Sequence, residues 1–450
     1  MTRPLRIAIV GAGPSGMYAA DALTTQAEIP VSVDVLDALP VPFGLVRYGV
    51  APDHLSIRSV RDTLDRILDT PGVRFLGNVT VGVDIDVDQL RTFYDAIIFT
   101  YGAARDRRLG IAGEDLDGSI AATDFVAWYT GHPAADRATF ERLLPTSHAA
   151  VVVGVGNVAV DVTRVLAKSA AELGHTDMPQ HVLSTLADHQ ISDIHVLGRR
   201  GPVQATFTTK ELRELGELAD ADVIVDPAEV LLDAASEEAV ARDKALARNL
   251  AVIRQWAERE PAGRSRRIHL RFLTRPVELL GEGRVAEVEV EQTALDGSGG
   301  VTGTGRRSRI TADLVVRSVG YRGVALPGLP FDDRGSVIPH QDGRVLADGE
   351  VQPGWYVAGW IKRGPTGIIG TNKKDAAATV ASLLQDAPTL PLAPAAAPEQ
   401  VDGWLADRGV SVVTTAGWRA IDAAERALGA QAGRDRTTIH ALPDLLAAAR

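Results

Sequence analysis

The sequence predicts an α/β protein with parallel sheets, because one β–turn–helix pattern occurs twice along the chain. The first copy, RIAIVGAGPSGMYAADAL, spans residues 6–23, and the second, HAAVVVGVGNVAVDVTRVLA, spans residues 148–167. Each copy joins a short apolar run to a glycine-rich turn and then to a helical pattern, as at the start of a nucleotide-binding unit. Two Rossmann-like nucleotide-binding domains are therefore expected.

Length and composition fit this expectation. A chain of 450 residues with 45% hydrophobic and 23% charged residues is an ordinary globular protein, long enough for two or three domains. The 47 basic and 58 acidic residues give a net charge of −11, which disfavours a nucleic-acid partner. The apolar runs are short, so no membrane span is expected. No targeting pattern is seen, so a cytoplasmic location is expected.

The chain has no cysteine. This excludes disulfides, thiolate zinc sites, iron–sulfur clusters held by this chain and a cysteine nucleophile. Redox chemistry would therefore need a bound cofactor. The ten histidines are scattered, with no ligand-like spacing and no Ser–His–Asp arrangement, so no metal site is expected.

The first glycine turn has the pattern Gly11-x-Gly13-x-x-Gly16. Such glycines allow a tight turn, close approach to a pyrophosphate and close packing of helix on strand. The run VSVDVLD (31–37) reads as the next strand and ends in Asp37, where an acid would accept from a ribose hydroxyl. The alternative is an α/β opening without a phosphate and with an incidental acid. The complete pattern favours a dinucleotide.

The second turn has the pattern Gly154-x-Gly156-x-x-Ala159, and its second strand, in DIHVLGRRGP (193–202), ends in Arg199 and Arg200. Guanidinium groups at this position would pair with a 2′-phosphate. The alternative is that both are solvated surface residues. Two sites of opposite character suggest FAD at the first turn and NADPH at the second, with hydride passing between them.

The other elements follow in chain order. Residues 40–54 form a long Pro/Gly loop, 94–103 a buried strand, and 309–323 and 354–367 late strands that end in glycine-rich turns. Gly364, Gly367 and Gly370 then precede a predicted helix over 371–385, whose N-terminus would stabilise a reduced flavin, with Trp360 near the ring. The alternative is a core tryptophan and an ordinary capping turn. A Pro/Ala linker (386–400) and small helices are expected at the end.

Several long motifs carry a resemblance to a known family. The segments VPFGLVRYGVAPDH, GVGNVAVDVTR, GRRGP with FTTKELREL, RSVGYRG and GWIKRGPTGIIGTNKKDA resemble the adrenodoxin reductase family over nearly the whole chain. These are FAD-containing NADPH–ferredoxin reductases of glutathione-reductase-like fold. The resemblance implies a discontinuous FAD-binding domain (1–104 and 325–450) and an NADPH-binding domain between its parts (105–324).

The resemblance also implies site residues. For FAD these are Gly11, Gly13, Ser15, Gly16, Asp37, Leu45, Val81, Trp360, Gly367, Ile368 and Ile369. For NADPH they are Arg107, Val155, Gly156, Asn157, Val158, Arg199, Arg200, Glu211 and Gly367. His54 and Glu214 stand where the family has polar active-site residues, and either is a catalytic candidate or a structural partner.

The chain departs from the family pattern at two positions. Asp37 stands where the family usually has Glu, and the shorter side chain would reach the ribose less directly. Val155 stands where the family usually has Gln or Asn, which removes one amide from the pyrophosphate site. Neither change removes the chemistry.

The implied acceptor is a ferredoxin, a small acidic iron–sulfur protein that takes single electrons and would feed a P450 or another oxidase. A basic island suits such a partner. It consists of Arg242, Lys244, Arg248, Arg254, Arg259, Arg264, Arg266, Arg267, Arg271 and Arg275, with only Asp243, Glu258 and Glu260 between them. The alternative is a solvated helix face. A monomer is expected.

Other classes of enzyme and binding protein also have two nucleotide-binding domains. A disulfide reductase and a small subunit of a glutamate-synthase-like enzyme both need cysteines, which this chain lacks. A flavin-dependent monooxygenase would need a substrate pocket, for which no motif is seen. A non-catalytic NADPH-binding redox sensor remains an alternative, and rapid NADPH-dependent reduction of an acceptor would distinguish the enzyme from it.

Overall fold

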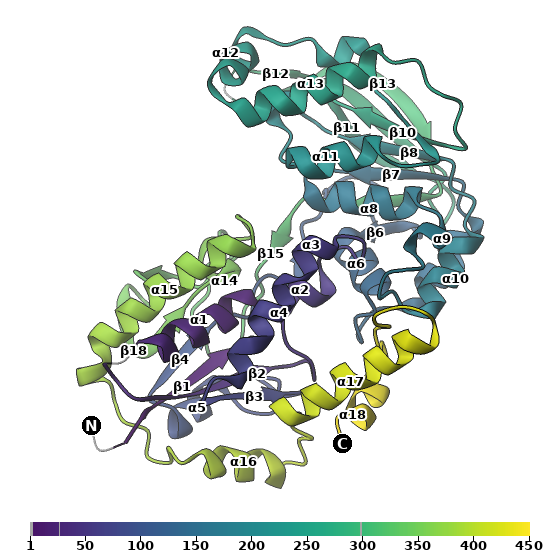
Figure 1. Ribbon diagram of the computed structural model, residues 1–450. Helices are drawn as coiled ribbons and strands as arrows, with labels where there is room; N and C mark the ends of the chain where they lie inside the picture. Colours follow the sequence, from purple (N-terminus) through teal and green to yellow (C-terminus); the bar gives the residue numbers. More distant parts are fainter. Residues whose placement is uncertain (1–2, 27, 298) are drawn as a thin grey trace. The chain divides into compact units, whose positions relative to one another are not determined.

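The computed structural model describes residues 3–26, 28–297 and 299–450, and the chain divides into two compact units (Figure 1). Unit 1 comprises Met1–Arg105 and Tyr321–Arg450, and unit 2 comprises Asp106–Gly320. Each unit contains a sheet whose central strands are parallel, with helices packed against it. The predicted α/β fold class is confirmed.

The sheet of unit 1 has β1 near its centre. All six residues of this strand (LRIAIV) are buried, as expected for a parallel strand covered on both faces. Ile7 lies in register with Val33 of β2 on one side and Ala96 of β4 on the other, and both pairings are parallel. The strand order is β16 (His340–Gln341), β17 (Arg344–Ala347), β18 (Glu350–Val357), β4 (Ala96–Phe99), β1 (Leu5–Val10), β2 (Val31–Asp37) and β3 (Val73–Gly77).

The helices of unit 1 come from both parts of its chain. α1 (Pro14–Thr25) packs beside α15 (Ile369–Asp386), so the first and last glycine-rich segments lie in one layer (Figure 1). The other helices are α2 (Leu45–Tyr48), α3 (Leu55–Arg58), α4 (Val60–Asp65), η1 (Arg66–Asp69), α5 (Val87–Phe93), α14 (Trp360–Arg363), η5 (Ala387–Thr389), α16 (Pro398–Asp407), α17 (Thr415–Gln431) and α18 (Leu442–Ala448).

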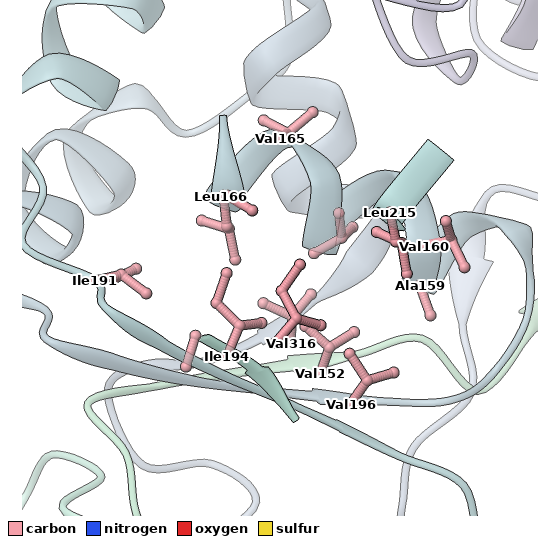
Figure 2. Packing of buried hydrophobic residues seen from close by; sticks show 14 of the residues in the cluster. Val152, Ala159, Val160, Val165, Leu166, Ile191, Ile194, Val196, Leu215 and Val316 are labelled. Atoms are coloured by element: carbon pink, nitrogen blue, oxygen red, sulfur yellow. The ribbon is translucent and has the colours of Figure 1, made fainter. Parts of the chain in front are cut away.

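Unit 2 repeats the plan around β7. Its strands in the order β6 (Ser119–Ala121), β14 (Leu314–Arg317), β7 (Ala149–Val153), β8 (Asp193–Leu197), β10 (Arg266–Arg271) and β9 (Ala221–Ile224) are parallel to their neighbours. Figure 2 shows how α8 (Asn157–Ala167) packs on this sheet, with Val160 and Leu166 among the strand side chains Val152, Ile194 and Val316. Burial of each such aliphatic side chain stabilises the unit by about 1.5–3 kcal/mol.

The remaining elements of unit 2 surround this core. An antiparallel sheet is formed by β11 (Thr274–Leu280), β12 (Glu287–Leu295) and β13 (Val301–Thr311). The helices are α6 (Ala122–Thr130), α7 (Arg137–Leu143), η2 (Leu144–Thr146), α9 (Ala170–Leu173), α10 (Gln180–Asp188), η3 (Pro202–Gln204), α11 (Thr209–Gly216), η4 (Pro227–Val230), α12 (Ala234–Arg242) and α13 (Lys244–Glu258). The short strand β5 (Arg105–Asp106) lies at the boundary in the sequence between the first part of unit 1 and unit 2, and β15 (Tyr321–Arg322) begins the second part of unit 1.

Most predicted elements are confirmed. The strand over 31–37 is β2, and the helix over 371–385 is α15, which begins two residues earlier. The predicted strand 309–323 is divided between the end of β13, β14 and β15. The expectation of small helices after residue 400 was wrong for α17, which has 17 residues. The antiparallel sheet of unit 2 was not predicted, because its strands alternate with polar residues and lack the apolar runs that mark the parallel strands.

Candidate functional site

The first glycine turn connects β1 to α1. Gly11 has φ +111°, and a Cβ there would lie 2.8 Å from the carbonyl group of Thr100, so only glycine fits. A Cβ at Gly16 would overlap the carbonyl oxygen of Gly11, which brings the helix close to the strand. By contrast, a Cβ at Gly13 would meet no atom within 4 Å. The free N–H groups at the start of α1 therefore border open space that fits a pyrophosphate.

Asp37 is the last residue of β2 and lies beside this turn. Its Oδ2 accepts from the backbone N–H of Ala12 at 2.7 Å, and its Oδ1 accepts from that of Leu39 at 2.9 Å. Burial of the carboxyl raises the pKa of Asp37 to about 6, against the opposing effect of these two bonds. Each carboxylate oxygen has a second lone pair, so the group can still accept from ribose hydroxyls.

The loop over residues 40–54 lies against the same turn. Phe43 donates its N–H to the carbonyl oxygen of Ala12 at 2.8 Å, and a Cβ at Gly44 would lie 3.1 Å from the Cα of Gly13. Leu45 begins α2 and is 39% exposed, which leaves an apolar side chain available for a ligand. The loop therefore forms one wall of the candidate FAD site.

Two further candidates lie elsewhere in unit 1. Val81 and His54 are both buried, and His54 immediately precedes α3. The N–H of Ile57 donates to the carbonyl oxygen of His54, which fixes the histidine backbone at the start of that helix.

The C-terminal motif reaches the first turn through Gly359. This residue has φ +80°, and a Cβ there would collide with the side chain of Ser15. Ser15 in turn lies 3.1 Å from the amide oxygen of Asn372 in α15. Trp360 is half-buried, with its ring centroid 5.4 Å from that of Tyr321. The structure thus brings Ser15 and this motif together.

The start of α15 is the exposed end of the same motif. Gly367 has φ +84°, and Ile368, which caps the helix, is 68% exposed. Ile369 is half-buried and packs against the core of unit 1. This end of α15 therefore leaves backbone N–H groups and one large apolar side chain open to a ligand.

The second glycine turn connects β7 to α8. Gly154 has φ +133°, and a Cβ there would overlap the carbonyl oxygen of Ser318. Gly156 caps the helix, and Ala159, at the third position of the pattern, is fully buried. The side-chain oxygen of Asn157 accepts from the N–H of Thr208 at 2.8 Å. The turn has the form of a second dinucleotide site.

Val155 is the second position at which the chain departs from the family pattern. A Cβ added at Gly198 would lie 2.9 Å from Val155 Cγ1, so this side chain fills the space beside the end of β8. Val155 and Val158 both pack against the core of unit 2. The carbonyl oxygen of Val155 accepts from the N–H of Thr206 at 2.9 Å.

Arg199 and Arg200 lie just beyond the end of β8, separated from it by Gly198. Their backbone is fixed, because Thr293 Oγ1 donates to the carbonyl oxygen of Arg199 at 2.7 Å and the N–H of Leu273 donates to that of Arg200 at 3.0 Å. Arg199 is exposed and Arg200 half-buried. In the described part of the chain, no ion pair or hydrogen bond engages either guanidinium group. Both fit a 2′-phosphate.

Three polar candidates remain in unit 2. Glu211 is 5% exposed, and among the described residues its Oε2 has no hydrogen-bond partner, which fits a ligand group. Glu214 lies one turn further along α11, with its Oε2 3.4 Å from the buried guanidinium of Arg164. Arg107 is exposed, and its backbone N–H donates to the carbonyl oxygen of Gly320 at 2.9 Å. The structure therefore gives Glu214 a partner within its own unit.

The basic island is less positive than its sequence indicated. Arg264 pairs with Asp222 at 3.9 Å and Arg275 pairs with Glu291 at 2.6 Å. Further pairs join Arg242 to Glu238, Arg267 to Asp193, and Arg271 to Glu229. These five acids lie outside residues 241–275, the segment that contains the basic island. The more open charges are on α13, and include Lys244, Arg248 and Arg254.

Within residues 3–26, 28–297 and 299–450, no three His, Asp or Glu side chains are grouped to hold a metal ion. No helix in these ranges is both long and apolar enough to cross a membrane.

Comparisons with known proteins agree with this geometry. The family model described as pyridine nucleotide-disulphide oxidoreductase matches residues 5–201. The chain is 46% identical to the NADPH-ferredoxin reductase FprA of Mycobacterium tuberculosis, with 99% of each chain covered. It is 37% identical to the mitochondrial NADPH:adrenodoxin oxidoreductase of Arabidopsis thaliana, with 100% of this chain and 96% of the relative covered.

A solved structure extends the likeness to three dimensions. The structure of Mycobacterium tuberculosis FprA in complex with NADPH superposes with a TM-score of 0.92 at 45% identity, covering 99% of this chain and 100% of that chain. The resemblance inferred from the motifs is confirmed. The chain therefore belongs to the family of NADPH-ferredoxin reductases and NADPH:adrenodoxin oxidoreductases.

Proposed function

We propose that the protein is a ferredoxin–NADP⁺ reductase, which takes electrons from NADPH through FAD to a ferredoxin. The observation that carries this proposal is the contrast between the two glycine turns. Asp37 closes the strand beside the first, whereas Arg199 and Arg200, free of protein partners in the described structure, close the strand beside the second. An acid suits a ribose with free hydroxyls, and two guanidinium groups suit a 2′-phosphate.

Unit 1 is the proposed FAD-binding domain. The open face of Gly13 and the N-terminus of α1 would take the pyrophosphate, and Asp37 would accept from the ribose. Leu45 and Trp360 would offer apolar contacts to the ring system, as would the start of α15. The full proposed set is Gly11, Gly13, Ser15, Gly16, Asp37, Leu45, Val81, Trp360, Gly367, Ile368 and Ile369.

Unit 2 is the proposed NADPH-binding domain. The N-terminus of α8 would take the pyrophosphate through the backbone N–H groups of residues 155–158, so the missing amide at Val155 is compensated by the helix end. Arg199 and Arg200 would pair with the 2′-phosphate. Arg107 and Glu211 complete the proposed set within unit 2, on the family pattern.

The chemistry is supplied by bound FAD, which accepts a hydride from NADPH and releases its electrons one at a time. The chain's own residues bind, orient and shield the two cofactors, and hydride transfer needs no side-chain acid. His54 is proposed as a polar residue of the reaction centre, on the family pattern. Glu214, which the sequence offered as a catalytic candidate, is better explained as a positioning residue because it pairs with Arg164.

The proposed partner is a small acidic iron–sulfur ferredoxin. Lys244, Arg248 and Arg254 on α13 keep their charges more open than the paired arginines of the basic island, so this helix is the better docking candidate. A cytoplasmic location and a monomeric state are part of the same proposal.

The test is a steady-state assay of cytochrome c reduction. Purified protein, NADPH and a candidate ferredoxin should together reduce cytochrome c, and omission of any one of them should abolish most of the rate. NADH should be a poor substitute for NADPH. A protein that binds both cofactors yet passes no electrons to any ferredoxin or to ferricyanide would instead be a redox sensor.

A further inference from the structure

A buried ion pair joins the FAD-site loop to the C-terminal part of the chain. Arg47, in α2, donates from Nη1 to Glu425 Oε2 at 3.1 Å, and a second bond runs from its Nη2 to Glu425 Oε1. The two side chains are 1% and 0% exposed. The residues are 378 positions apart, so the pair ties α17 to the loop that lies against the first glycine turn.

Glu425 is the centre of a wider network. Arg436 donates to its Oε2 at 2.8 Å, and the N–H of Ile439 donates to its Oε1 at 2.9 Å. Arg436, which follows α17, also pairs with Asp422, a residue on the same helix as Glu425. Residues 415–440, here called the C-terminal clasp, therefore converge on one buried carboxylate that faces Arg47.

The clasp also contacts the loop through aromatic rings. The rings of Trp418 and Phe43 meet nearly at right angles, with centroids 5.6 Å apart and planes at 85°. The guanidinium of Arg47 lies 5.6 Å from the Trp418 ring and 5.0 Å from that of Tyr48. Trp418 is held in turn by Asp65, which accepts from its indole N–H at 2.9 Å.

The loop needs such support because its backbone is strained. Phe43 has φ +82°, a left-handed value that costs free energy for a residue with a Cβ, and Gly44 follows with φ +47°. Strained conformations persist only where surrounding contacts determine them. In this loop those contacts are the bond from Phe43 to Ala12, the Trp418 ring and the Arg47–Glu425 pair.

We propose that Glu425 and Trp418 are positioning residues of the FAD site, which hold residues 43–48 in the conformation that binds the cofactor. This inference rests on the proposed function of unit 1. A buried ion pair adds little to the free energy of unfolding, because burying two charges is costly. It does select one conformation of the loop, because any other conformation would leave a buried charge unpaired. The C-terminal clasp would therefore hold residues 43–48 in the binding conformation already in the apoprotein.

The test compares Glu425→Gln with a matched control, Asp95→Asn. Asp95 is a buried carboxylate of the same unit that accepts from Arg3 at 2.7 and 2.8 Å and from the N–H groups of Arg6 and Ala393. It lies at the start of β4, at the opposite end of the sheet from the glycine turn. Both variants should lower the melting temperature.

The two variants should differ in the site itself. Glu425→Gln should raise the Kd for FAD by about tenfold or more and speed amide hydrogen exchange over residues 43–48 of the apoprotein, whereas Asp95→Asn should leave both within about twofold. Glu425→Asp should restore part of the affinity, since it keeps the charge. Equal effects of Glu425→Gln and Asp95→Asn on FAD binding, or no effect of Glu425→Gln, would overturn the proposal.

A second variant covers the case in which Glu425→Gln does not fold. Trp418→Phe keeps an aromatic ring but removes the contact area above Phe43, and it should speed exchange at Phe43–Val46 and weaken FAD binding. Unchanged exchange and affinity in this variant would also overturn the proposal. Failure of the wild-type protein to bind FAD is a separate result, which would contradict the proposed function and not the role of the clasp in ordering the loop.

Discussion

The carboxylate of Glu214 lies 3.4 Å from the guanidinium of Arg164, a side chain that is 1% exposed in unit 2. Arg164 is also paired with Asp161 at 2.9 Å, so two carboxylates surround one buried cation between α8 and α11. Because α8 carries the second glycine turn, this pair fixes the helix whose N-terminus would meet the NADPH pyrophosphate.

Glu214→Gln should therefore act mainly on stability. The glutamine carries no negative charge to balance the buried Arg164, so the free energy of unfolding is expected to fall by about 1–3 kcal/mol. The rate of flavin reduction at saturating NADPH should change little. Urea denaturation and stopped-flow reduction of the same preparation check this prediction. A large loss of rate with unchanged stability would place Glu214 among the reacting groups.

The double substitution Arg199→Ala and Arg200→Ala should weaken the binding of NADPH and leave the use of NADH almost unchanged. Each charge-assisted bond to the 2′-phosphate contributes roughly 1.5–3 kcal/mol, reduced by solvent, so the loss should be about 10- to 1000-fold in NADPH affinity. NADH lacks the phosphate, so its kcat/KM should barely change. Steady-state kinetics with both nucleotides provides the measurement, with Arg306→Ala on exposed β13 as the control. An equal loss for both nucleotides would mean that these arginines serve the fold.

FAD binding should depend on pH through Asp37. Its pKa is raised to about 6, so the apoprotein carries a proton on this carboxyl in mild acid. Ribose hydroxyls donate to the ionised form, so FAD affinity should fall by up to about tenfold per pH unit below about 6. Titrations of apoprotein with FAD from pH 5 to 8, monitored by flavin fluorescence, measure this effect. Asp37→Asn should flatten the profile, and an unchanged profile would remove Asp37 from the site.

The raised pKa of Asp37 also makes the stability of the apoprotein depend on pH. A folded pKa of about 6 against an ordinary value of 3.8 means that the folded apoprotein holds the proton more tightly than the unfolded chain. The contribution of this group to stability is therefore present below about pH 4 and is lost as the pH rises through about 6. Asp37→Asn should remove that loss.

Ferredoxin docking should depend on α13 more than on β10. Reversal of Arg248 to Glu should raise the ferredoxin KM, increasingly so at low salt, and leave ferricyanide reduction nearly unchanged. Arg267→Glu should instead lower stability, because Arg267 pairs with Asp193. Parallel assays with both acceptors measure the difference. Equal changes for ferredoxin and ferricyanide in the Arg248 variant would show that α13 is not the docking face.

Local patterns made much of the site predictable. Gly11, Gly13, Gly16 and Asp37 stand at fixed intervals on one strand–turn–helix–strand unit, so backbone geometry alone places them together. Arg199 and Arg200 were proposed for the NADPH site in the same way, because the end of β8 is where a Rossmann-like unit would meet the adenosine ribose.

Long-range pairings were not predictable from these patterns. The charge balance within residues 241–275 missed the acids that neutralise the basic island, since Asp193, Glu229 and Glu291 come from other elements of unit 2. The Arg47–Glu425 pair was missed for the same reason. Its only local signal was an arginine in an otherwise apolar loop and a glutamate in a helix rich in alanine.

The most direct test of the account is an anaerobic titration of the purified protein with NADPH. We predict a yellow protein that holds about one non-covalent FAD per chain, released by acid precipitation, since the chain offers no cysteine for a covalent link. NADPH should bleach the flavin absorbance rapidly, NADH only slowly, and added ferredoxin should restore the colour. A folded, colourless protein that cannot be reconstituted with FAD, or a bound flavin that NADPH does not reduce, would contradict the account.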